Sequence, residues 1–198
     1  MEKILITTSF GLESLVKFQL RDMGYKDYEV SDGLISLKGD LSDLAKLNIN
    51  LKHADRVYLE VASFKAMEFE ELFENVNKIP WQDILNEDSN FTVNARSYKS
   101  KLFSLRSIQS ISEKALIDKL KNYYKKTFFE KSAERVNIEI MIEKNIVKVC
   151  LDTSGDGLHK RGYREGTVKA PLRENLRQKR AQLNGQSVLE SVILTNIL

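Results

Sequence analysis

Short apolar runs and amphipathic stretches alternate over the first 65 residues. Runs rich in apolar and β-branched residues predict four strands, at 3–8, 28–30, 34–37 and 56–64. Leucines and other apolar residues recur at helical spacing in two further stretches, which predict helices at 11–23 and 40–51. The order strand, helix, strand, strand, helix, strand is that of a ferredoxin-like βαββαβ unit, and we expect this unit over residues 1–65.

A second α/β unit follows from residue 66. Two amphipathic stretches predict helices, at 69–79 and 105–124. Runs with the alternation or β-rich composition of strands lie at 91–97, 136–142 and 146–151. Because no low-complexity or Pro/Gly-rich linker separates the two units, we expect an α+β molecule in which they pack together.

The composition excludes several classes of protein. With 42% hydrophobic and 30% charged residues, the chain is typical of a globular protein. Its single cysteine, Cys150, excludes a disulfide framework and a four-cysteine zinc or iron–sulfur site, and we expect it to be a small buried hydrophobe. No apolar run approaches the roughly 20 residues of a membrane helix, and the N-terminus lacks the apolar stretch of a signal peptide. We therefore expect no membrane association and a cytoplasmic location.

Positive charge is concentrated in one late segment. Residues 159–180 hold eight Lys and Arg against two Glu, a net charge of +6, although the whole chain carries only +3. Such asymmetry favours a polyanionic partner. A solvated basic turn, or an intramolecular partner for the acidic helix at 68–74, is the alternative interpretation.

Two groups of residues are candidates for contact with nucleic acid. The first lies within the basic segment and comprises His159, Lys160, Arg161, Tyr163 and Arg164. Arginine forks match phosphate oxygens, and tyrosine stacks on a base or ribose. The second group lies where a strand enters the long helix and comprises Arg96, Lys99, Lys101 and Arg106. Helix N-terminal amides also bind phosphate there, and a solvated loop is the alternative.

No catalytic or cofactor motif is visible. The nine glycines do not form the G-x-G-x-x-G pattern of a nucleotide or S-adenosylmethionine site, and there is no P-loop. Asp152, Asp156 and His159 indicate a tight charged turn rather than a metal site, because the other histidine, His53, is over 100 residues away. We expect no catalytic residue, bound cofactor or metal in this chain.

The string LDTSGDGLHKRGYR at 151–164, followed by KAPLRENL at 169–176, resembles a known family. These residues are similar to the bacterial 23S rRNA guanine-N2 methyltransferases that carry a THUMP domain, which are often labelled N6-adenine-specific DNA methylases. The likeness covers about residues 1–176. Further matching motifs are Gly11–Glu13, Asp32-Gly33, Gly39-Asp40, Ala54–Val57, Phe69–Phe73, Ile79–Trp81 and Glu113–Asp118.

The resemblance implies a domain order. A ferredoxin-like domain at 1–65 is followed by a THUMP domain at 66–165, which binds structured RNA. In the family a Rossmann domain then binds S-adenosylmethionine and modifies a guanine. We expect that domain to be absent from these 198 residues. Residues 166–198, which follow the THUMP domain, would be a linker and an atypical tail. In this tail Arg177–Arg180 stands where the family usually has small residues. A truncation, a frame-altered product and a deliberately made or stand-alone fragment all remain open.

The expected function is therefore recognition of structured RNA, with 23S rRNA as the partner implied by the resemblance. The chain would be the substrate-recognition portion of an S-adenosylmethionine-dependent rRNA (guanine-N2) methyltransferase and inactive by itself. Within the family, the basic segment at 159–164 would alternatively dock the catalytic domain. In a different class, the chain is a protein-interaction module that uses the apolar tail at 187–198 to bind a partner or self-associate.

Overall fold

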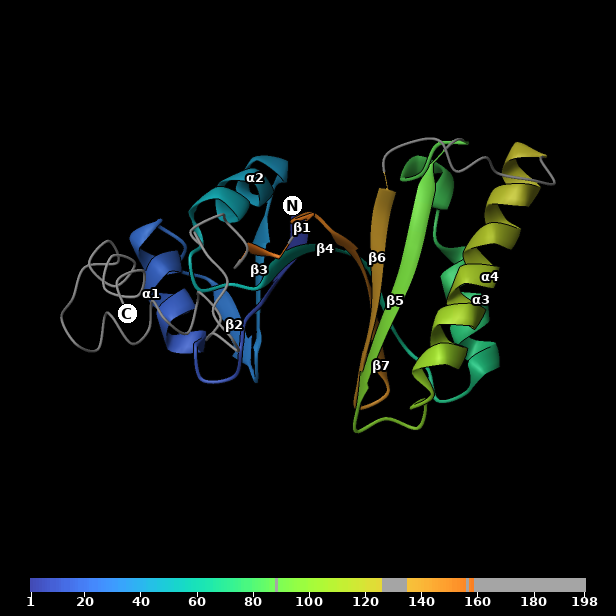
Figure 1. Cartoon of the computed structure of the whole chain (residues 1–198), viewed down its shortest axis with the longest axis horizontal. Coiled ribbons are helices and arrows are strands. Elements are labelled where there is room, and N and C mark those ends of the chain that lie inside the picture. Colours follow the sequence, from blue (N-terminus) through green and yellow to red (C-terminus); the bar gives the residue numbers. More distant parts are fainter. Residues whose placement is uncertain (88, 126–134, 156, 159–198) are drawn as a thin grey trace, which may run out of the picture. The chain divides into compact units, whose positions relative to one another are not determined.

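A computed structural model describes residues 1–87, 89–125, 135–155 and 157–158. The described chain divides into two compact units (Figure 1). The first contains residues 1–58 together with the described residues from 153 onward, and the second contains residues 59–152 without the gaps. Each unit contains two α-helices and part of one seven-stranded sheet, with a 3-10 turn added in the second.

The first unit has the ferredoxin-like topology expected from the sequence. Its elements are β1 Glu2–Thr7, α1 Glu13–Asp22, β2 Tyr28–Ser31, β3 Leu34–Gly39, α2 Leu41–Asn50 and the beginning of β4, Arg56–Lys65. The strands follow the order β2-β3-β1-β4, and β3 is antiparallel to both β1 and β2. The predicted βαββαβ arrangement is confirmed.

Local sequence explains how this unit is built. Val16 and Leu20 of α1 and Leu44 and Leu47 of α2 are the buried positions that helical spacing predicts. Helix α2 begins with a capping box, in which the Asp40 carboxylate accepts hydrogen bonds from the Ser42 and Asp43 amides while the Asp43 side chain accepts one from the Asp40 amide. The apolar stripes and the cap together set where both helices lie along the sequence.

The β2–β3 turn requires glycine. Gly33 has φ +68°, and a Cβ placed there would lie 3.1 Å from the Thr8 carbonyl oxygen. The Gly33 amide donates to Glu13 Oε1 at 2.9 Å, and its carbonyl accepts from the Thr8 amide at 3.0 Å. The turn is thereby held against the loop that leads into α1.

The second unit is built around a parallel crossover. It contains the end of β4, helix α3 Phe69–Lys78, a 3-10 turn at Trp81–Asp83, β5 Asn90–Tyr98, α4 Leu105–Tyr124, β6 Arg135–Glu143 and β7 Ile146–Asp152. The strand order is β4-β7-β6-β5, with β5 parallel to β6 and β6 antiparallel to β7. Every element predicted for this part of the sequence is present, so the α+β assignment is confirmed.

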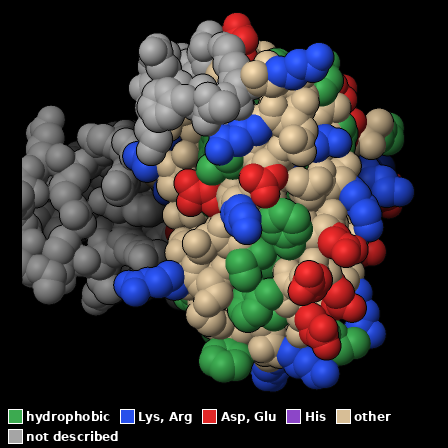
Figure 2. Space-filling view, turned by 90° about the vertical axis from the view of Figure 1, so that its right-hand side faces the viewer, with side chains coloured by type: hydrophobic (Ala, Val, Ile, Leu, Met, Phe, Trp, Pro, Cys, Tyr) green, Lys and Arg blue, Asp and Glu red, His purple; other side chains and the backbone are tan. Residues whose placement is uncertain are grey.

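Helices α3 and α4 cover one face of this sheet (Figure 1). Ile138 and Ile140, two positions apart on β6, both point to that face. They form one core with Leu72 of α3 and Ile108 of α4. Trp81 is fully buried in the same core, where its indole Nε1 donates to the Val76 carbonyl at 2.8 Å. The outer surface of these helices carries charged side chains and a band of apolar ones (Figure 2).

The segment after β7 belongs to the first unit. The Thr153 amide donates to the Val57 carbonyl at 3.1 Å, and Ser154 Oγ accepts from the Val57 amide at 2.7 Å. The side chain of Asn48 on α2 joins these hydrogen bonds: its Nδ2 donates to Thr153 Oγ1, and its Oδ1 accepts from Ser154 Oγ. Thr153 and Ser154 therefore tie this segment to β4 and α2.

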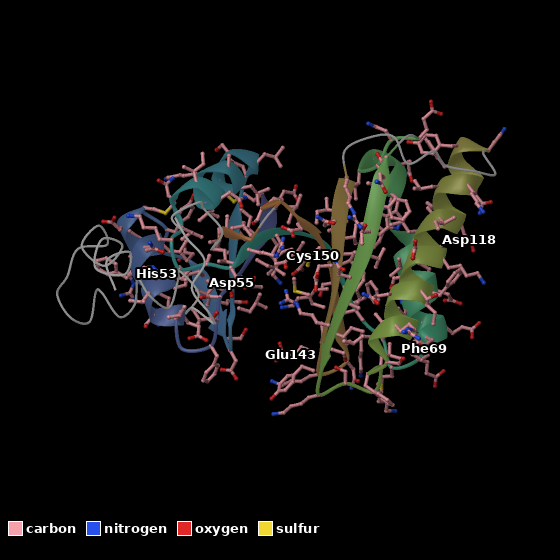
Figure 3. All side chains as sticks on the ribbon, viewed as in Figure 1. His53, Asp55, Phe69, Asp118, Glu143 and Cys150 are labelled. Atoms are coloured by element: carbon pink, nitrogen blue, oxygen red, sulfur yellow. The ribbon has the colours of Figure 1, made fainter. Side chains whose placement is uncertain are left out.

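His53 lies in the segment that connects α2 to β4 and is buried, with 1% of its surface exposed (Figure 3). Its backbone carbonyl accepts from Thr8 Oγ1 at 2.8 Å, but neither ring nitrogen has a hydrogen-bond partner among the described residues. Burial, with a smaller effect from the charge of Lys52, lowers the pKa of the imidazole from 6.5 to about 4. The ring is therefore neutral in the folded protein near pH 7.

We expect acid to destabilise the fold through His53. Between pH 6.5 and about 4 the unfolded chain takes up a proton that the folded imidazole does not, so the free energy of unfolding falls as pH falls. His53→Leu removes this contribution. The stability difference between wild type and His53→Leu should change by about 1.4 kcal/mol per pH unit in this window, as measured by denaturant unfolding. Parallel pH dependences of the two proteins would contradict the expectation.

Candidate nucleic-acid interface

Five of the nine residues assigned to RNA contact lie outside the described residues. They are His159, Lys160, Arg161, Tyr163 and Arg164. The apolar tail at 187–198 also lies outside them. The assignments in these segments stay predictions. The other four residues lie on β5, in the loop at 99–104 that follows it (the β5–α4 loop) and in the first turn of α4.

Arg96 lies on the sheet rather than in the loop. Its neighbour Ala95 packs against the helix-covered core, so Arg96 projects from the other face. There Arg96 Nε is 3.6 Å from Glu139 Oε1, and Nη2 donates to Met141 Sδ at 2.9 Å, both on β6. The charge of Arg96 is thus compensated by a neighbouring strand, and Arg96 is not brought together with the loop cations.

The β5–α4 loop is held in place by the turn between β6 and β7. The Lys144 amide donates to the Tyr98 carbonyl at 3.2 Å, and the Asn145 amide donates to Ser100 Oγ at 3.0 Å. In return, Asn145 Oδ1 accepts from the Lys101 amide at 2.8 Å. Leu102 anchors the centre of the loop in the core with only 3% of its surface exposed. The loop therefore has a defined shape.

Three strands of the second unit end at a lysine on the same edge of the sheet. Lys65 is the last residue of β4, Lys99 follows β5 and Lys144 follows β6. Because β5 and β6 are parallel, their carboxyl ends lie together, and a bond from the Ala66 amide to the Asn145 carbonyl brings the end of β4 to the same place. Sequence reasoning missed Lys65 and Lys144, although a lysine at the end of each strand was a visible signal.

Lys101 and Arg106 enlarge this cationic edge. Both side chains are exposed, as are those of the three strand-end lysines. We call the five together the cationic edge: Lys65, Lys99, Lys101, Arg106 and Lys144. Glu143 Oε1 lies 3.7 Å from Lys144 Nζ, so one cation of this edge is paired with an acidic neighbour (Figure 3).

The neighbouring carboxylate of Glu71 is committed to capping α3. Its Oε2 accepts from the Met67 amide at 2.6 Å and the Glu68 amide at 3.3 Å. These hydrogen bonds are the main cause of its lowered pKa, to which the charges of Lys65 and Lys101 add. Glu71 is therefore ionised, and its carboxylate is bonded to the backbone at the start of α3 rather than to the β5–α4 loop.

Helix α4 begins without a capping side chain. Its N-cap, Ser104, makes no side-chain hydrogen bond to the helix backbone, and its Oγ lies 2.7 Å from Ser107 Oγ. The first turn holds Arg106 and no acidic residue. The amides and dipole of a helix start favour an anion, so the position of this start agrees with the predicted phosphate contacts.

Two aromatic rings are exposed beside these cations. Phe103 has 80% of its surface exposed, and Tyr98 has 55%. Lys99 Nζ lies over the Tyr98 ring, 4.9 Å from its centroid. In Figure 2, Lys and Arg side chains are spread over this face, and some lie at its lower end, where Figure 1 shows the β5–α4 loop. The interface thus combines positive charge with aromatic surface.

Other kinds of site find no support in the described part of the chain. No group of three or more His, Cys, Asp and Glu able to hold a metal occurs among the described residues. Burial raises the pKa of the Cys150 thiol, which is fully buried and so protonated near neutral pH. None of the helices in the described ranges has the length and apolar character needed to cross a membrane.

Two domain families match successive parts of the chain. Residues 3–58 match the RlmL ferredoxin-like domain, and residues 66–152 match the THUMP domain. The first match falls on the βαββαβ unit and the second on the unit that carries the cationic edge. The two matches reproduce the order expected from the sequence.

Longer proteins are similar along most of this chain. "Putative RNA methyltransferase YpsC" of Bacillus subtilis is 37% identical over 182 residues, which are 91% of this chain and 47% of that protein. A solved structure described as a "predicted N6-adenine-specific DNA methylase" from Listeria monocytogenes is 37% identical with a TM-score of 0.83, covering 92% of this chain and 48% of that one.

A third relative was solved with a ligand. SMU.472, "a putative methyltransferase complexed with SAH", is 35% identical with a TM-score of 0.81, and the match covers 92% of this chain and 48% of that one. The chain therefore spans about half the length of the relatives it matches.

Asn145 is the residue on which we expect the shape of the loop to depend most. Its φ of +66° suits asparagine, and its side chain accepts from Lys101. Asn145→Ala should lower the free energy of unfolding by about 1–2 kcal/mol through the lost hydrogen bond and the strained backbone. Asn145→Asp, which keeps the acceptor, is the matched control and should stay close to wild type in denaturant unfolding. Equal losses in the two variants would contradict this role.

Proposed function

Because its residues form an RlmL ferredoxin-like domain followed by a THUMP domain, we propose that this chain is the RNA-binding, substrate-recognition part of an S-adenosylmethionine-dependent rRNA (guanine-N2) methyltransferase. The main support for the RNA-binding part of this proposal is the cationic edge. Five exposed cations from separate segments of the second unit lie around one loop. Structured RNA, with 23S rRNA as the substrate, is the partner that we propose.

Charge and shape would supply most of the affinity. Each Lys or Arg that neutralises a phosphate releases a counterion, so binding weakens steeply as salt rises. The fixed loop presents its cations at set positions along a backbone, and such contacts carry little information about base sequence. The basic segment at 159–164 lies outside the described residues, and we propose that it binds phosphates of the RNA as well or, in the alternative, docks a catalytic domain.

The methyl-transfer half of the proposal comes from relatives. YpsC is named an RNA methyltransferase, and SMU.472 was solved with SAH. The described residues do not fit S-adenosylmethionine, because the strand that enters the parallel crossover ends in Tyr98-Lys99-Ser100-Lys101 rather than in a glycine-rich loop. We therefore assign recognition to this chain and no chemical step to its described residues. A cytoplasmic location likewise remains a prediction.

Removing two cations from the edge should weaken RNA binding and reduce its salt dependence. Lys101→Gln with Arg106→Gln removes two exposed charges. We expect about tenfold weaker binding to structured rRNA fragments, and a slope of log K against log salt that is smaller by about 1.4 to 1.8. Fluorescence anisotropy across a salt series measures both quantities.

The matched control removes the same charge from the far end of α4. Lys119→Gln with Lys121→Gln changes residues about 20 and 22 Å along the helix from Arg106, taking 1.5 Å per residue. This control should leave the affinity within about twofold and the slope close to wild type. Equal effects of the two double variants would mean that only net charge matters, and the edge would not be the interface.

The late basic segment yields a separate prediction. Changing Lys160, Arg161 and Arg164 together to Ala should weaken RNA binding about tenfold or more, because charge-assisted hydrogen bonds to phosphate are lost. The same anisotropy titration measures it. An unchanged affinity in a protein with wild-type thermal unfolding would place RNA contact elsewhere.

A further inference from the structure

We infer that the Phe103 ring stacks on an unpaired base of the bound RNA, so that the cationic edge recognises a nucleotide outside a duplex together with its flanking phosphates. The inference rests on the proposed function and deepens it. It adds to the phosphate contacts a class of substrate: RNA with a loop, bulge or single-stranded end. Phe103 was not among the residues that the sequence assigned to RNA.

The exposure of Phe103 is a fixed feature of the loop. Its neighbour Leu102 is buried in the core, and Ser104 on its other side begins α4. The Ser97 hydroxyl also bonds the Leu102 carbonyl, which fixes the backbone directly before the ring. The chain cannot turn Phe103 inward without withdrawing Leu102. The 80% exposed ring is therefore imposed by the way its neighbours are anchored.

The ring of Phe103 is open to a partner. In the described chain, no ring–ring or cation–ring contact involves Phe103, whereas Tyr98 already has Lys99 Nζ over its ring. Phe103 thus presents a π-surface, and Tyr98 presents one that a cation partly covers. Of the two exposed rings, Phe103 is the one suited to stacking.

The charges around the ring favour a nucleic acid over an apolar protein surface. Lys101 lies two residues before Phe103 and Arg106 three residues after it, both exposed. A partner must therefore offer negative charge within a few ångströms of an aromatic face. An RNA nucleotide meets both requirements. Its base must be unpaired, because neighbouring base pairs cover both faces of each base inside a duplex.

The test compares two RNAs of equal length and charge. One is a two-stranded duplex with an unpaired single-stranded end, and the other is a two-stranded duplex that is paired to both ends and has no loop. Phe103→Ala should weaken binding to the first about tenfold and leave the second within about twofold, with the salt slope unchanged for both. Phe103→Tyr is the matched control and should restore most of the affinity, because it keeps a stacking ring.

An abasic nucleotide in the single strand identifies the contact. The abasic site should weaken RNA binding by wild type. It should hardly weaken binding by Phe103→Ala, because this variant has already lost the stacking contact. Equal loss on both duplexes, no loss on either, or a change confined to self-association in light scattering would overturn the inference. If wild type binds neither RNA at low salt, the proposed function fails as well. If it binds both regardless of Phe103, only this inference fails.

Discussion

Parallel pairing of β5 with β6 is the constraint on which the second unit depends. Parallel strands need a crossover, and the twenty-residue helix α4 supplies it while covering the core face of the sheet. The same pairing brings the ends of both strands to one edge, where the β6–β7 turn meets the β5–α4 loop. Lys99 and Lys144 lie close for this reason alone. An antiparallel arrangement would have placed them at opposite edges.

Periodicity was sufficient to locate the elements. The predicted helix at 105–124 has the bounds of α4, and the strands at 136–142 and 146–151 agree with β6 and β7 to within a residue. These segments bury one clear face, so their pattern is strong. The site was predicted less completely. Lys65 and Lys144 enter it through strand pairing, and Arg96 is paired with Glu139 across β6, which a single sequence does not reveal.

The contribution of each unit follows from its chemistry. The second unit presents charge and aromatic surface on a fixed loop, whereas its only thiol, Cys150, is buried and protonated. In the first unit, the buried neutral ring of His53 affects stability, and neither ring nitrogen has a hydrogen-bond partner among the described residues. The proposed recognition surface and the pH dependence of stability therefore involve different side chains.

The hydrogen bonds that tie Lys101 and Lys144 to their neighbouring loops have a kinetic consequence. A surface that already has its bound shape loses little conformational entropy when a ligand arrives, and the ligand need not wait for the loop to order. Encounter with a polyanion would then be limited by diffusion and charge. Differences among RNAs would appear mainly in how long each complex lasts, as dissociation rates.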